Sequence, residues 1–223
     1  HMVLSWLERD DGKHQILPDH KRRLMEYLAA ELWRAGRRVW SVGELEQWLI
    51  DVLARRPDVA AHYDGKEREL LKEDLRTATF LVREGEDSFR FAHTSLQEFF
   101  LAGYLLEALL QGKPEAWVLP MPSPETLDFL GQLLAEEAGS GDKALMTLRE
   151  LRDTWRPRAS ELAFSYALLA VRKGYPAPST AGFRLEGADL RDCQISGREN
   201  EARVNLRGAC LRGARLSGAE LSH

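Results

Sequence analysis

His93 is the residue of this chain whose type and position could do chemistry. It follows a segment in which Phe89 and Phe91 alternate with polar residues, the pattern of a half-buried strand. Ser95 and Glu98 have the spacing of a capping box, which predicts a helix that starts just after His93. An imidazole at such a corner can carry a proton near neutral pH and donate a charge-assisted hydrogen bond. The alternative is a histidine that is satisfied by backbone groups at the helix start.

The rest of the sequence contains no motif for catalysis or metal binding. It has no G-x-x-x-x-G-K-[ST], because the nearest stretch, residues 139–143, lacks both the spacing and the hydroxyl after the lysine. C-x-x-C, H-E-x-x-H and nucleophile-elbow patterns are missing as well, so neither a metal site nor a hydrolase is predicted. Adjacent acids point apart on a helix, and three such pairs are interpreted as solvated surface: Asp10 with Asp11, Glu73 with Asp74, and Glu136 with Glu137. We therefore expect this chain to need no cofactor and neither to bind nor to hydrolyse ATP by itself.

Composition is that of a globular protein: 223 residues, 44% hydrophobic and 30% charged, with a net charge of −4. No apolar run approaches the roughly 20 residues that span a bilayer, and the charge gives no reason to expect a membrane or nucleic-acid partner. Two cysteines, Cys193 and Cys210, fit a reducing cytoplasm. His1 and Met2 are interpreted as the remnant of an expression vector, and Val3 opens an apolar helical fragment abruptly, so we expect an excised part of a longer protein.

The elements that would position His93 are predicted from local signals. Apolar spacing predicts a helix over about 20–35, another after the capping box of Ser41 and Glu44, and a third over about 66–77. A hairpin over 80–92 follows, and three helices before a two-stranded wing is the order of a winged helix. Glycines and prolines over 111–124 predict a linker or domain edge. Three further helices are expected, starting at Pro124 and running over about 142–154 and 158–173.

Residues Phe89 to Leu105 resemble the end of the winged-helix domain of NACHT-type signal-transduction ATPases, the bacterial relatives of animal NOD-like receptors. The signature of that domain reads roughly F-x-H-x-S-x-Q-E-F-F-A-A-x-Y-L. The resemblance implies that His93 reaches the β-phosphate of ADP held by the ATPase domain of the parent protein and so locks the resting form. ADP or ATP and Mg²⁺ would then belong to the parent. Exchange for ATP after sensing would release the winged helix and permit oligomerisation.

The last 42 residues change period, because leucine or isoleucine recurs every five residues, with a step of 11 between Ile195 and Leu206. The pattern resembles the pentapeptide-repeat family, A-(D/N)-L-x-x, and is clearest over 188–192. The family implies a right-handed, four-sided β-helix with four repeats to a turn, so about two coils are expected. The break near Asn200 predicts a loop. Because single repeats cannot bury their cores, the array should dock on the helical module, with four leucines in its core: Leu190, Leu206, Leu211 and Leu216.

Two other functions of such folds are disfavoured. Winged helices often bind DNA, but the candidate recognition helix, residues 66–76, balances four acids against four bases and would repel phosphates. Pentapeptide proteins that mimic DNA and inhibit topoisomerases are long and acidic, whereas residues 180–223 hold seven arginines against six acids. A short, near-neutral array is interpreted as a surface that faces a partner.

The predicted fold class is mainly α, with a winged-helix (α+β) domain, a small helical module and a C-terminal right-handed quadrilateral β-helix. The predicted segments are the end of a preceding helical region (3–19), the winged helix (20–112), a helical domain (113–178) and the repeats (179–223). The function expected is the regulatory and sensor part of a NACHT-type ATPase, with an unknown protein trigger at the repeats. Many bacterial relatives serve in antiphage defence, so that role is implied. The alternative is a stand-alone scaffold or adaptor without nucleotide dependence. A P-loop encoded upstream of Val3 would favour the first, and a natural start codon at Met2 the second.

Overall fold

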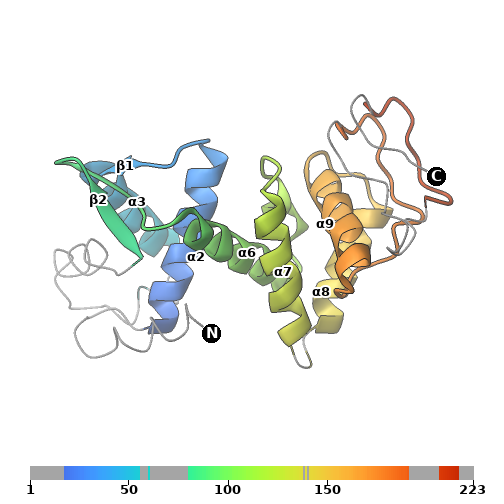
Figure 1. Cartoon of the computed structure of the whole chain (residues 1–223), viewed down its shortest axis with the longest axis horizontal. Coiled ribbons are helices and arrows are strands. Elements are labelled where there is room, and N and C mark those ends of the chain that lie inside the picture. Colours follow the sequence, from blue (N-terminus) through green and yellow to red (C-terminus); the bar gives the residue numbers. More distant parts are fainter. Residues whose placement is uncertain are drawn as a thin grey trace. The chain divides into compact units, whose positions relative to one another are not determined.

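The computed structural model describes residues 18–55, 60, 80–137, 139, 141–190 and 206–215 (Figure 1). The chain divides into two compact units, residues 1–101 and 102–223, and the division falls inside helix α6. The helix expected over 66–77 lies outside the described residues, as do residues 3–17 of the region expected over 3–19, whose last two residues belong to the first described helix. Each unit is built by its own set of side chains and is described separately below.

The described residues of the first unit form two helices, a three-stranded antiparallel sheet of order β1-β3-β2 and the start of a further helix. In chain order the elements are α2 (Pro18–Arg34), β1 (Trp40–Ser41), α3 (Val42–Arg55), β2 (Leu81–Glu84), β3 (Ser88–Phe91) and α6 (Thr94–Gln111). Two of the three helices expected before the hairpin are described, and the short strand β1 between them was not predicted. Figure 1 shows the hairpin beside α3.

Local signals set the helix ends in this unit. Helix α2 ends where the N–H of Arg37 donates to the carbonyl of Leu32 at 3.0 Å, with Gly36 in the left-handed region at φ 63°. The capping box of α3 is confirmed. The backbone N–H of Ser41 donates to the carboxylate of Glu44 at 2.8 Å, and the N–H of Glu44 donates to the Ser41 hydroxyl at 3.3 Å.

The predicted hairpin is also confirmed, with Leu81 opposite Phe91 and Glu84 opposite Ser88. Gly85 turns the chain between the strands at φ 68°. The core beneath the hairpin is apolar and includes the buried side chains of Leu28, Leu45, Trp48, Phe80, Phe89, Phe91 and Phe100. The apolar residues of the strand pattern and of the helix patterns in the sequence therefore share one core.

The second unit is helical until its repeats begin. It contains the end of α6, a short 3-10 helix η2 (Pro114–Trp117), α7 (Pro124–Glu136), α8 (Gly141–Asp153) and α9 (Ala159–Lys173). The predicted cap of α7 is confirmed, because the hydroxyl of Ser123 accepts the N–H of Thr126 at 3.2 Å. Gly174 closes α9 in the left-handed conformation, as its place after the apolar run indicated.

The stretch 111–124, expected as a linker, is anchored to the second unit. Trp117 is fully buried, and its indole N–H donates to the backbone carbonyl of Leu105 on α6 at 3.0 Å. Between α6 and α7 the stretch contains only the short helix η2 as regular structure, and one large ring holds it in place. Glycine and proline content reports where a helix must end, and it does not report whether the connection packs.

The described repeats pair in parallel and contact α9. Arg184 pairs with Cys210 and Asp189 with Arg215, so partners lie 26 positions apart, about six more than four pentapeptides supply. The excess falls within 191–205, which includes the expected loop and lies outside the described residues. The ring of Phe183 meets that of Phe164 on α9 edge to face, with centroids 5.2 Å apart, so the expected docking on the helical module is confirmed.

Burial of the predicted repeat core is uneven. Leu190 is fully buried, as are Leu185 and Ala188 in the same stretch. Leu206 and Leu211 are only half-buried, so their expected place in a closed core is wrong for these residues, and Leu216 lies outside the described residues. The physical reason is position, since the first coil packs against α9 whereas Leu206 and Leu211 belong to the coil stacked on it.

None of the helices within the described ranges has the length and apolar character needed to cross a bilayer.

Candidate functional site

His93 lies where strand β3 ends and helix α6 begins, and its side chain is exposed. Its backbone carbonyl accepts the N–H groups of Leu96 at 3.1 Å and Gln97 at 3.5 Å, so His93 is the residue that flanks the helix. The helix begins at Thr94, directly after His93 as expected, and two residues earlier than a capping box with Ser95 as its N-cap requires. The imidazole makes no hydrogen bond or ion pair with the part of the chain that the structure describes.

Arg90 fixes the two residues before His93. Its guanidinium donates to the carbonyls of Phe91 at 3.0 Å and Ala92 at 3.5 Å, and it pairs with Glu84 across the hairpin at 3.2 Å. Sequence reasoning did not single out Arg90, because an arginine on the outward face of an alternating strand is ordinarily solvated surface. Its use as a brace for the corner is visible only once the carbonyls beyond the strand are placed.

Aromatic rings support the corner from beneath. The ring of Phe100 lies 5.1 Å from that of Phe80 and 5.8 Å from that of Phe91, between centroids. The N–H of Ala92 donates to the carbonyl of Phe80 at 2.8 Å, which ties the end of β3 to the start of the hairpin. Phe91 of β3 and Phe100 of α6 thus pack on each other. The exposed His93 lies between the strand and the helix that these two rings join.

The corner is electropositive. The first N–H groups of α6 point toward its N-terminus without partners in the helix, and the first turn carries no acidic residue. The Arg90 guanidinium on the strand that leads into it is paired with Glu84, so the helix start itself supplies the positive end. Such an arrangement can receive an anionic oxygen. The other candidate for a binding helix, residues 66–76, lies outside the described residues.

Comparison with known families matches two parts of the chain. Residues 10–105 match the family described as a winged helix-turn-helix domain C-terminal to NACHT, and residues 202–223 match the family described as pentapeptide repeats (8 copies). No curated protein and no solved structure matched the chain. The winged-helix match contains His93, the hairpin and the first part of α6.

Proposed function

We propose, from the premise that this chain carries a winged-helix domain of the kind found C-terminal to NACHT, followed by pentapeptide repeats, that it is the regulatory and sensor part of a NACHT-type signal-transduction ATPase. The winged helix holds the resting ADP state of the parent protein, and the repeats bind a partner. The observation that carries the proposal is the exposed imidazole of His93 at an electropositive helix start within the matched domain.

His93 acts in the closed state, where it donates a charge-assisted hydrogen bond to the β-phosphate of ADP in the ATPase domain of the same protein. The bracing of Phe91 and Ala92 by Arg90 supports this role, because a short side chain positions a proton only if its backbone is fixed. ADP, ATP and Mg²⁺ are held by the ATPase domain. This chain does not form the nucleotide site, and His93 contacts the bound nucleotide from outside it.

The repeats are the sensor. Their parallel pairing supports a right-handed, four-sided β-helix that grows from α9. A protein trigger that binds the open state more tightly than the closed state shifts the balance between them. A swing from 1:99 to 99:1 takes about 5.5 kcal/mol of differential binding. The open parent then oligomerises in the cytoplasm, in the service of antiphage defence.

The test is His93→Ala in the intact parent protein. Loss of a charge-assisted hydrogen bond worth roughly 1.5 to 3 kcal/mol raises a rare open fraction about 10- to 150-fold. We expect faster release of bound ADP and signalling without a trigger. The matched control is Thr94→Ala, which changes the next exposed residue and should leave ADP release unchanged. A folded His93→Ala protein with normal ADP retention and no autoactivity contradicts the nucleotide role.

A second measurement addresses the chain alone. Without a P-loop it should show no ATP binding by calorimetry and no hydrolysis, since it has no backbone cradle or lysine for the phosphates. Micromolar affinity for ATP would mean that the nucleotide site is not confined to the ATPase domain. The gene sequence upstream of Val3 is an independent check, because the proposal requires a P-loop and an acidic magnesium motif there.

A further inference from the structure

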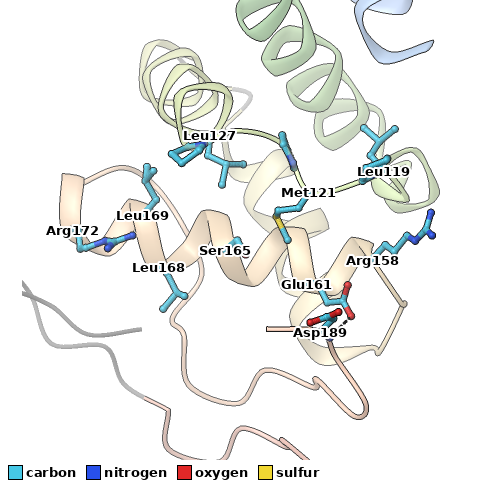
Figure 2. Close-up of a pocket in the computed structure, with 13 residues that line it drawn as sticks. Leu119, Met121, Leu127, Arg158, Glu161, Ser165, Leu168, Leu169, Arg172 and Asp189 are labelled. Atoms are coloured by element: carbon cyan, nitrogen blue, oxygen red, sulfur yellow. Dashed lines mark hydrogen bonds between the residues drawn. The ribbon is translucent and has the colours of Figure 1, made fainter. Parts of the chain in front are cut away.

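The second unit contains a groove that the nucleotide role does not use. It lies between residues 119–124, which lead into α7, and one face of α9, and its volume is about 1000 Å³ (Figure 2). Ser165, Leu168 and Arg172 recur along α9 at helical spacing and line one wall, and Asp189 of the first described repeat lies at one end. The groove therefore adjoins the place where the repeats begin.

The floor of the groove is buried and apolar, whereas its rim carries an exposed apolar side chain. Leu127, Leu168 and Leu169 are buried, so the floor is part of the packed interior. Met121 stands on the rim, is 43% exposed, and points across the groove toward α9 in Figure 2. Val118, three residues earlier in the same segment, is 45% exposed. A flexible thioether over an apolar floor is a surface that adapts to an incoming apolar group.

Two cations stand at opposite ends of the groove. Figure 2 shows Arg172 at one end and Arg158 at the other, and 14 positions on a helix separate them by about 21 Å. Near Arg158, the carboxylate of Glu161 accepts the backbone N–H of Asp189 at 2.9 Å, so one of its oxygens is directed at the repeat backbone. Arg158 is exposed, and its guanidinium has no hydrogen bond or ion pair among the described residues.

The backbone at Arg158 is unusual as well. It is the one residue other than glycine with a positive φ among the described residues, at φ 66° and ψ −47°. A side chain in that conformation strains the backbone, and the surrounding structure must offset the strain. The strained backbone of Arg158 places its side chain at the mouth of the groove. Strained residues of this kind are found at ligand-binding sites.

We propose that this groove binds an extended, apolar segment of a partner protein that carries an acidic residue at its end. About seven extended residues cover 21 Å, the separation of the two arginines, and the volume is at the upper end of the range for binding pockets. Apolar side chains of the segment occupy the floor beneath Met121, and its carboxylate meets Arg158. The inference goes beyond the proposed function, because it needs neither nucleotide nor the parent ATPase.

The probe is a library of random peptides of about seven residues, displayed on phage and selected against the full chain. We expect the enriched peptides to combine apolar residues with a terminal Asp or Glu. Their affinity, measured by fluorescence polarisation, should fall at least about 10-fold in Met121→Glu, which places a charge over the apolar floor. Met146→Glu is the matched control, since Met146 is 65% exposed on α8 and lies outside the groove.

A charge exchange tests the acidic end. Arg158→Glu should weaken an acidic peptide by at least about 10-fold and strengthen the same peptide with Lys in place of its acid. Arg149→Glu, an exposed site on α8, is the control for net charge. The proposal is overturned if no peptide is enriched, if the enriched peptides are basic, or if the two control variants weaken binding as much as the groove variants. These results leave the role of His93 untouched, because that role is measured in the parent by ADP release.

Discussion

Two helices of this molecule begin beside an exposed basic residue, and the two starts are held by different forces. Helix α6 follows His93 and rests on the rings of Phe80, Phe91 and Phe100. Helix α9 follows Arg158, and the turn before it is bonded by a buried hydroxyl. Ring packing is spread over many atoms without a preferred direction, whereas a hydroxyl network relies on a few directed bonds.

The hydroxyl at the start of α9 is that of Ser160, which is fully buried. It donates to the carbonyl of Leu151 at 2.8 Å and accepts the backbone N–H of Arg156 at 3.0 Å. The turn before α9 is thus tied to the end of α8 through this hydroxyl, and the ion pair of Arg156 with Glu150 at 2.8 Å adds a second link. An exposed binding residue can therefore be positioned either by packed rings beneath it or by hydrogen bonds around it. Mutations should destabilise the two helix starts to different extents.

The largest effect is expected where the α9 region continues into the repeats. Leu190→Asp places a carboxylate at a fully buried position next to Asp189, whose N–H bonds Glu161 on α9. The cost should be several kcal/mol, enough to release the repeats to a protease. Leu211→Asp, at a half-buried position, should cost much less. Limited proteolysis followed by mass spectrometry separates the two variants, and equal resistance would show that packing does not hold the first coil.

Phe100→Ala should be the most damaging change at the α6 start. It removes a fully buried ring that contacts the rings of Phe80, Phe91 and Phe99, at a cost of about 3 to 5 kcal/mol. Chemical denaturation followed by tryptophan fluorescence measures the loss. Phe99→Ala is the neighbouring control, because Phe99 is only half-buried and should cost less. If the two variants lose the same stability, the corner does not rest on the ring cluster.

Ser160→Ala should cost roughly 1 to 3 kcal/mol, because it leaves the N–H of Arg156 and the carbonyl of Leu151 buried with one partner fewer. The same denaturation experiment applies, with Ser165→Ala on the same helix as the reference. A loss no larger than that of Ser165→Ala would mean that the α9 start is held by packing as well, and the contrast between the two helices would disappear.

The smallest effect concerns a third helix start, that of α3. The Arg37 guanidinium bonds the Glu44 carboxylate, and with Ser41 it lowers the pKa of Glu44 to about 2. A lowered pKa contributes stability above the unfolded value of about 4.3, and that stability is lost as pH falls through about 2. Glu44→Gln should therefore lower the melting temperature slightly at pH 7 and not at pH 2. The effect is small because this pair is exposed. An undiminished difference at pH 2 would assign it to something other than charge.

The comparison also explains what the sequence could reveal. Phe89 and Phe91 at strand spacing, followed by the apolar residues of the helix, indicate where α6 starts. The position of His93 between strand and helix was therefore predictable. The α9 start was predicted from a helix expected over about 158–173, but nothing in the residue types indicates that Ser160 bonds backward or that Arg158 has a positive φ. Bonds from side chain to backbone depend on where distant carbonyls lie, and no periodicity records that.

The groove was not predicted for the same reason. Its walls come from a proline-rich segment and from a helix face whose leucines look like ordinary core residues. Arg90 escaped notice because its role is to bond carbonyls outside its own strand. What could be read was the order of elements and their ends, since capping residues and glycines act locally.

The stacked glycines of the repeats have a consequence for how this protein can evolve. Gly182 lies against Gly208, and Gly187 lies against Gly213. A Cβ added to Gly208 or Gly213 would stand about 4 Å from the backbone of its partner glycine. Each pair has a positive φ, and bonds such as Gly187 N–H to Arg212 carbonyl join the coils through backbone atoms alone. A tandem duplication of one coil would therefore meet the same donors and acceptors as the original. The length of the array can change by copying DNA, without the invention of a new interface.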